Sequence, residues 1–342
     1  MPNILEKLII FIIRIFFKLI FALIKFIRKI LFKISLNILF ISESLFEKKI
    51  YPYMYSIDYS LSNFLKNNSK QNYIFKIFKF LQEGENSTAK ISPEKNNYST
   101  WSEFNFRSIL ITVDQNSERT KSTLKKLHAL SIQPDIFLGK TPKNLVNHID
   151  TKNPLLSTSR PRDIACFVSH LLAIKYAIDN FDNEFFLIME EDVILFHNPK
   201  LVGLSSVLTN KDWEVLQLEH LMPECVNRNK RFYQSGILLH RWMNPVDYGA
   251  SAYIIRRKFA QNLIKYFLNS DNDKIDLKKC YQYNYPIVTD NIIYDIAQTL
   301  VFTFPLAQQD LDFPSLLGYP SYITKLRIAS KNLVNEIWRD YT

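Results

Sequence analysis

From about residue 104 onward, the order of apolar and polar residues predicts strands that alternate with helices. Short apolar runs bounded by turn residues are typical of strands buried on both faces of a sheet. Apolar residues at helical spacing lie between them. This alternation predicts an α/β sheet covered by helices on both faces. The predicted strands are 108–113, 134–138, 185–189, 213–218 and 248–255, and the predicted helices are a segment through Leu130 that opens after Asn116 or Ser117, then 164–180 and 257–267.

The strand predicted at 185–189 runs directly into three acids, Glu190, Glu191 and Asp192. In open α/β sheets, ligands bind outside the carboxyl ends of the strands. Glu190 and Asp192 share one face of an extended segment, and Glu191 points the other way. Adjacent carboxylates repel each other unless a cation lies between them, and a hard divalent cation takes oxygen ligands. The alternative interpretation is a solvated acidic turn after a core strand.

Residues 4–41 are apolar, but cations interrupt them at intervals of seven and four residues. On a helix these cations form one narrow stripe, and Ile, Leu and Phe cover the other sides. The pattern predicts a helix that lies in the interface of a membrane, with its cations toward anionic headgroups. A tilted spanning helix and a helix that binds a protein partner are the alternatives. The stripe consists of Lys7, Arg14, Lys18, Lys25 and Lys29.

These patterns divide the chain into three segments. Residues 1–45 are the amphipathic membrane-anchoring helix. Residues 46–103 are aromatic-rich and partly helical, and they end in a polar linker that contains Gly84 and Pro93. Residues 104–342 form the α/β domain.

Composition excludes several classes of site. The formal net charge is +10, but residues 1–50 hold nine Lys or Arg against three Glu and so carry +6 of it. The basic character is therefore mainly N-terminal and does not indicate binding of nucleic acid by the body. The six glycines never cluster, which excludes a dinucleotide fingerprint and a P-loop. Three widely separated cysteines form neither a C-x-x-C pair nor a disulfide framework, as is typical of a reducing compartment.

Five short motifs follow one another between Arg107 and Gly318. In this order they resemble glycosyltransferase family 25, the lipooligosaccharide and collagen-galactosyl type. Ala165 stands where the family has Gly, and Glu191 stands where it has the middle Asp of an acidic triplet. The motifs are a strand and turn at Ile111–Arg119, a Cys-x-x-Ser-His block at Ala165–His170, the acids at Met189–Asp192, a small-residue segment at Gly249–Arg257, and a Pro-x-Asp-type block at Pro286–Asn291.

The resemblance implies a GT-A fold that transfers a hexose, galactose or glucose, from a nucleotide diphosphate sugar with Mn²⁺ or another divalent cation. Residues 104–342 are then a GT-A-like catalytic domain. Glu190 and Asp192 are the expected metal ligands, because a divalent ion can bridge both phosphates of the leaving group. Arg119, His170 and Glu191 are the expected contacts of the nucleotide sugar. Arg119 as a surface residue and His170 as a structural hydrogen-bonding residue are the alternatives.

An inverting transfer also needs a base that removes the proton of the acceptor hydroxyl. Asp290 is our first candidate and Asp247 the second, with a helix cap or a loop acid as the alternative for each. The expected acceptor is a lipopolysaccharide, lipooligosaccharide or related surface glycan. The expected location is the cytoplasmic face of the inner membrane, where the protein would be peripheral or monotopic and would bind the anionic surface through residues 4–41.

Two rival functions use the same acids. One is a membrane-bound, non-catalytic interaction protein on a degenerate glycosyltransferase scaffold. The other is a metal-dependent hydrolase, which normally needs more His or Asp ligands than this domain gathers. Turnover of a nucleotide sugar with and without Mn²⁺ separates the first rival from a transferase.

Overall fold

The computed structural model describes residues 101–149, 160–196, 203–209, 212–234, 236–242, 247–269, 274–282, 287–314, 316–317 and 321–341. The chain divides into units at Met1–Ile77 and Phe78–Thr342, and every described residue belongs to the second unit. The predictions for the arm at 1–45 and the segment at 46–103 therefore fall almost entirely outside the described residues and stay predictions.

The described part of the chain contains the following elements. The strands are β1 Phe106–Thr112, β2 Asp135–Leu138, β3 Phe185–Glu190, β4 Val193–Leu195, β5 Val215–Gln217, β6 Leu239–Arg241, β7 Ala252–Arg256, β8 Thr299–Phe302 and β9 Ala307–Gln309. The α-helices are α5 Glu118–Ala129, α6 Pro161–Asn180, α7 Leu204–Thr209, α8 Pro223–Gln234, α9 Arg257–Phe267, α10 Thr289–Ile296 and α11 Ser321–Tyr341. Short 3₁₀ helices occur at η2 Trp101–Glu103, η3 Leu145–Asn147 and η5 Leu277–Gln282.

A seven-stranded sheet in the order β2-β1-β3-β7-β5-β8-β6 forms the centre of the domain. Neighbours β2, β1 and β3 are parallel, as are β5 and β8, whereas β7 and β6 run against the strands beside them. Strands β4 and β9 form a separate antiparallel pair. The protein is thus a mixed α/β protein whose central sheet is mostly parallel.

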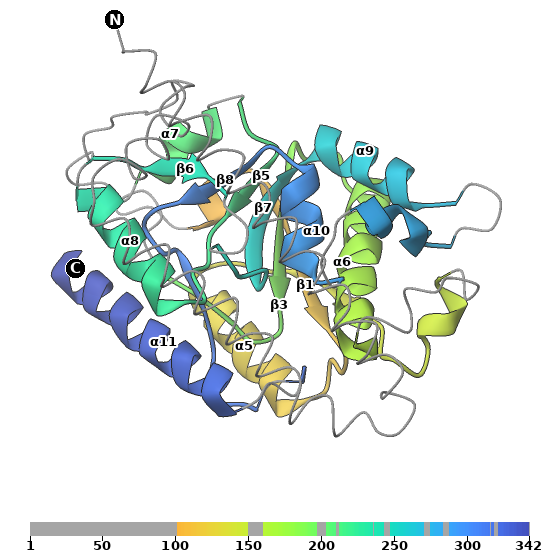
Figure 1. Ribbon diagram of the computed structural model, residues 1–342, viewed down its shortest axis with the longest axis horizontal. Coiled ribbons are helices and arrows are strands. Elements are labelled where there is room, and N and C mark those ends of the chain that lie inside the picture. The colour runs from red at the N-terminus through yellow and green to blue at the C-terminus, as the bar shows by residue number, and fades with distance from the viewer. Residues whose placement is uncertain are drawn as a thin grey trace, which may run out of the picture. The chain divides into compact units, whose positions relative to one another are not determined.

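Helices cover both faces of this sheet because side chains alternate along each strand. On β3, Phe186 and Ile188 pack with the core on the side of α6, α9 and α10. Leu187 and Met189 pack with the opposite core, to which α5, α8 and α11 contribute. Figure 1 shows these two groups of helices on opposite sides of the strands. All four side chains are fully buried, so β3 is a central strand held from both sides.

The predicted α/β fold with helices on both faces is confirmed. Helix α9 spans the predicted residues 257–267, and the predicted start of the first helix is correct, because the Ser117 side chain accepts a hydrogen bond from the Thr120 N–H. The strand predicted at 248–255 begins later, at Ala252, because Gly249 has a φ of 133°, which is outside the strand region. No helix among the described residues is long and apolar enough to cross a membrane.

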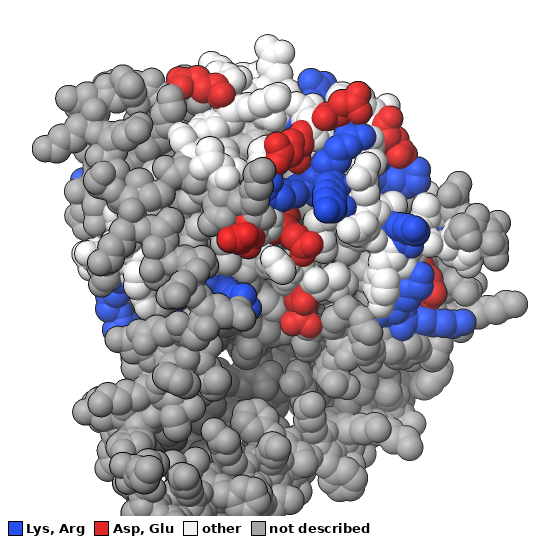
Figure 2. Space-filling model, turned by 90° about the horizontal axis from the view of Figure 1, so that it is seen from above, with Lys and Arg blue, Asp and Glu red and all other residues white. Residues whose placement is uncertain are grey.

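On the face of the molecule seen in Figure 2, lysine and arginine side chains lie beside aspartate and glutamate side chains. Among the residues coloured in this view, the surface therefore mixes both signs of charge.

Candidate active site

A cavity of about 260 Å³ opens at the carboxyl ends of β1 and β3, beside the first turns of α6. It brings together five of the side chains singled out in the sequence. Cationic side chains of Lys140 and Arg162 also line it. The five are Arg119, His170, Glu190, Glu191 and Asp192.

The three acids turn to different partners although they are adjacent in the sequence. Glu191 is buried, and its carboxylate accepts hydrogen bonds from the hydroxyls of Thr112 and Thr120, the latter at 3.0 Å. The Arg119 guanidinium lies 3.8 Å from Oε1 of the same carboxylate. The Thr123 hydroxyl donates to the Glu191 carbonyl at 2.6 Å. Glu191 therefore ties the end of β3 to the first half of α5.

Asp192 is buried, and only one of its two carboxylate oxygens lies near a cationic partner. Burial, together with the charge of nearby Glu190, raises the pKa of Asp192 to about 7. Its Oδ2 lies 3.9 Å from Nη1 of Arg119, but its Oδ1 is buried without a hydrogen-bond partner among the described residues. Gln309 of β9 lines the same cavity, and its Oε1 is likewise buried and unpartnered. Such oxygens are costly to bury unless something in the cavity satisfies them.

Two side chains of α6 contact the Glu190 carboxylate from the interior of the protein. Its Oε1 lies 3.0 Å from Nε2 of His170 and 3.4 Å from Sγ of Cys166. These three atoms all lie within 4.8 Å of one another, so the group has the spacing of a metal site. However, burial and the Glu190 charge raise the pKa of the Cys166 thiol well above its usual value. A protonated thiol is a hydrogen-bond donor, so the group is a hydrogen-bonded cluster rather than a set of ready ligands.

The residues present fit a hard divalent cation. Such ions prefer carboxylate and amide oxygens. Glu190, Asp192 and Gln309 supply such oxygens along one wall of the cavity, and two of these oxygens are buried and unpartnered. The predicted ligands Glu190 and Asp192 thus line one cavity, and their roles stay predictions.

One further acid, Glu219, is missed by the sequence analysis. It lies two residues beyond β5 and is 1% exposed. Its Oε2 accepts the Ser251 N–H at 3.0 Å, and its Oε1 is buried without a partner. Burial, with the charges of Asp192 and Glu190, raises the pKa of Glu219 to about 8. The signal in the sequence is a second apolar strand that ends in an acid, Leu216-Gln217-Leu218-Glu219.

A close approach of the backbone accompanies Glu219. A Cβ atom on Gly249 would lie 2.8 Å from Oε2 of Glu219, and the positive φ of Gly249 also favours glycine. The Gly249 N–H donates to Oδ2 of Asp290 at 3.0 Å, and the Asn291 N–H donates to Oδ1 at 3.0 Å. Asp290 is buried in the first turn of α10 and is not among the residues that line the cavity.

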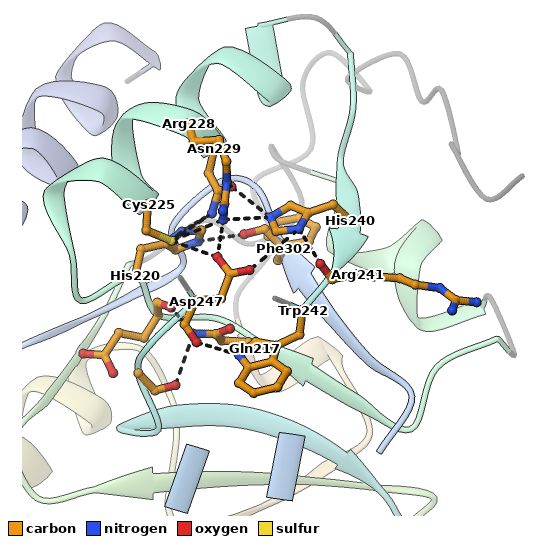
Figure 3. A network of polar contacts seen from close by, with 12 residues as sticks. Gln217, His220, Cys225, Arg228, Asn229, His240, Arg241, Trp242, Asp247 and Phe302 are labelled. Carbon is orange, nitrogen blue, oxygen red and sulfur yellow. Dashed lines mark hydrogen bonds and ion pairs between the residues drawn. The ribbon is translucent and has the colours of Figure 1, made fainter. Parts of the chain in front are cut away.

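Asp247, the second candidate base, lies in a separate network (Figure 3). Its carboxylate is fully buried, forms an ion pair with Arg228 and accepts a hydrogen bond from the Cys225 thiol at 3.1 Å. Burial lowers the pKa of both neighbouring imidazoles, His220 and His240, to about 4, so they are neutral at pH 7. The network joins the start of α8 to β6 and the segment before β7, and none of its residues lines the cavity.

The fold is an α/β domain with a cavity at the carboxyl ends of two strands of its sheet. Residues 106–277, half of the chain, match the family described as glycosyltransferase family 25 (LPS biosynthesis protein), and the chain belongs to this family. The resemblance inferred from the motifs is thereby confirmed, and the protein is a glycosyltransferase. None of the curated proteins compared with the chain matches it.

Three solved structures share parts of the fold at low similarity. A197 from STIV is 11% identical with a TM-score of 0.30, over 58% of this chain and 82% of that chain. Apo mouse xyloside xylosyltransferase 1 is 6% identical with a TM-score of 0.31, over 55% and 79%. Glucosyl-3-phosphoglycerate synthase from Mycobacterium tuberculosis, in complex with Mn²⁺, uridine diphosphate and phosphoglyceric acid, is 8% identical with a TM-score of 0.20, over 45% and 56%. At these scores they carry no argument about the site.

We expect Asp247→Ala to destabilise the fold by about 3–5 kcal/mol, because it leaves the half-buried Arg228 guanidinium without its carboxylate. The measurement is urea unfolding followed by circular dichroism. Asp182→Ala is the matched control, since that acid is solvent-exposed and should change stability little. A variant at Asp247 that is as stable as the wild type but inactive would contradict the structural role and favour the predicted role as base.

Proposed function

We propose that the protein is a metal-dependent, inverting glycosyltransferase of the GT-A type. It moves a hexose, galactose or glucose, from a nucleotide diphosphate sugar to a hydroxyl of a lipopolysaccharide, lipooligosaccharide or related surface glycan. The observation that carries the proposal is the cavity at the ends of β1 and β3, with acids on one wall and cationic side chains nearby. Membership of family 25 supports the reaction class.

The donor has chemically distinct parts that this cavity can match. Arg119, Lys140 and Arg162 supply positive charge for a diphosphate, and Arg side chains suit bidentate contacts with phosphate oxygens. Apolar side chains provide a surface for the flat base of a nucleotide. These side chains are Ile111, Val113, Pro142, Leu316 and Leu317.

Glu190 and Asp192 would hold a divalent cation such as Mn²⁺, with the Gln309 amide oxygen beside them. When bound, such an ion neutralises the developing charge of the departing nucleoside diphosphate. The chain's own residues do the remaining work. Arg119 neutralises part of the charge on Glu191 and Asp192, so the acids can stay close together before the donor binds.

Asp290 remains the proposed base, with Asp247 second. Burial raises the pKa of Asp290, although its two backbone hydrogen bonds oppose the shift. A higher pKa suits a residue that must accept a proton near neutral pH. Catalytic hydrogen bonds commonly tighten only once the substrate is bound, so Asp290 would meet the acceptor hydroxyl in the substrate complex.

We further propose that residues 4–41 bind the cytoplasmic face of the inner membrane, because a lipid-linked acceptor is presented at that surface. The stripe of Lys and Arg in this segment suits anionic headgroups, and its Ile, Leu and Phe suit the acyl boundary. This proposal depends on the sequence pattern alone.

Asp192→Ala should abolish the Mn²⁺ dependence of donor binding and lower transfer by on the order of 10²–10³-fold, because several kcal/mol of charge stabilisation are lost. The measurements are initial rates and calorimetric titration of a nucleotide sugar with and without Mn²⁺. Glu118→Ala is the control, since this acid is exposed on α5 and pairs only with Lys121 among the described residues. Unchanged turnover in Asp192→Ala would remove the metal-site proposal, and a wild-type protein without any turnover would favour the non-catalytic rival.

Asp290→Asn should keep donor binding and lower transfer by on the order of 10²–10⁴-fold, because the amide cannot accept the acceptor proton. Donor affinity and transfer rate are measured separately on the same preparation. Loss of donor binding would reassign Asp290 to the donor site, and full activity would move the role to Asp247 or another acid.

Deleting residues 1–45 should abolish sedimentation with anionic vesicles while transfer to a water-soluble acceptor analogue persists. High salt should only weaken binding of the full chain, because salt screens the cations but leaves burial of the apolar face at about 25 cal/mol per Å². Full-length protein with the five stripe cations changed to Gln separates the two contributions. Equal binding by the truncated form would place the membrane contact elsewhere, and protease protection on both sides of the arm would show that it spans.

A further inference from the structure

A chain of hydrogen bonds leads from the middle of the sheet to Glu190. His170 on α6 is 1% exposed, and its Nε2 lies 3.0 Å from Oε1 of Glu190. Its Nδ1 lies 3.0 Å from the hydroxyl of Tyr253 on β7, and the two rings stack with centroids 5.7 Å apart. A carboxylate can only accept hydrogen bonds, so Nε2 carries the proton and donates. In the neutral imidazole Nδ1 then accepts from the Tyr253 hydroxyl.

Cys166 supplies a second donor to the same oxygen. It lies one helical turn before His170, so both side chains share one face of α6. Its Sγ lies 3.4 Å from Oε1 of Glu190 and 3.3 Å from the Thr289 hydroxyl. The Cys166 thiol donates to Glu190, because a carboxylate oxygen can only accept.

Because of these two donors, the two oxygens of the Glu190 carboxylate have different surroundings. Oε1 is occupied by His170 and Cys166, whereas Oε2 has no hydrogen bond to any described residue. The side chain is 22% exposed and lines the cavity. Turning the carboxylate so that neither oxygen faces His170 and Cys166 would break both hydrogen bonds inside the protein.

We propose that His170, Cys166 and Tyr253 are positioning residues that fix Glu190 with Oε2 toward the cation in the cavity. This inference rests on the proposed function, in which Glu190 is a metal ligand. His170 then acts through Glu190 and makes no contact with the nucleotide sugar, unlike the role suggested by the sequence. Hydrogen bonds to a ligating carboxylate commonly contribute 10- to 100-fold to metal affinity.

The test measures Mn²⁺ affinity of the full chain by electron paramagnetic resonance of free Mn²⁺, without any donor sugar. His170→Phe should weaken Mn²⁺ binding by about 10- to 100-fold, because it keeps a ring but removes the donor to Oε1. His170→Gln should weaken it less, since its side-chain amide can still donate. Tyr253→Phe should weaken it by about three- to tenfold, as expected for the loss of one hydrogen bond.

Tyr294→Phe is the matched control for Tyr253→Phe. Tyr294 is equally buried, its ring packs against Tyr253 at 5.8 Å, and its hydroxyl donates to the Gly249 carbonyl at 2.9 Å. The control therefore loses one buried tyrosine hydrogen bond outside the chain that leads to Glu190. Its Mn²⁺ affinity should equal that of the wild type even if its melting temperature falls.

The outcomes separate this inference from the proposed function. If the wild type binds Mn²⁺ and Asp192→Ala does not, while His170→Gln, His170→Phe and Tyr253→Phe all keep wild-type affinity, the positioning role is wrong and the metal site stands. If His170→Phe keeps its Mn²⁺ affinity but loses affinity for the donor sugar, His170 contacts the donor instead. If the wild type binds no Mn²⁺, the metal in the proposed function is wrong, and the positioning role toward it falls too. Circular dichroism checks that each variant is folded. If His170→Phe is not folded, Tyr253→Phe and His170→Gln still test the positioning role.

Discussion

The arrangement of the cavity depends on one constraint, which is that three consecutive carboxylates are enclosed where β3 leaves the sheet. Acids this close repel each other, and burial makes each charge more costly. The structure meets the cost with a different set of partners for each acid. Glu190 receives donors from α6, Glu191 receives hydroxyls from β1 and α5, and Asp192 keeps one buried oxygen without a partner. In the proposed function, a cation or a donor bound in the cavity would complete this hydrogen bonding and charge balance.

Packing of the strand supplies the rigidity that such a site needs. Residues 186–189 are fully buried and point alternately into the two cores. The strand is parallel to β1 and antiparallel to β7, and the Glu190 N–H extends the pairing by donating to the Ser251 carbonyl at 2.9 Å. The acids thus begin where the hydrogen bonds between β3 and its neighbouring strands end. This pairing restricts the backbone at the start of the acidic segment. The hydrogen-bond partners of each acidic side chain then determine its rotamer.

Local pattern is sufficient to predict the strands near the acids and the helices beside them, because burial on both faces leaves an apolar run that periodicity detects. Other parts of the site are held by tertiary pairing that periodicity cannot detect. Gln309 reaches the cavity because β9 pairs with β4, and Glu219 meets the Ser251 N–H because β5 lies beside β7. Asp247 illustrates the converse limit. As an acid among apolar and aromatic residues it was the second candidate base, and its partners Arg228 and Cys225 come from a helix that the sequence analysis did not predict.

The middle acid shows how a departure from the family pattern fits this structure. Glu191 stands where the family has Asp, and its side chain is one methylene longer. Its carboxylate reaches across to Thr112 on β1 and Thr120 on α5, while the Thr123 hydroxyl binds its backbone carbonyl. The shorter Asp would place its carboxylate nearer the backbone and farther from these hydroxyls. In this chain the Glu191 side chain therefore attaches α5 to the end of β3, while it also lines the cavity together with Glu190 and Asp192.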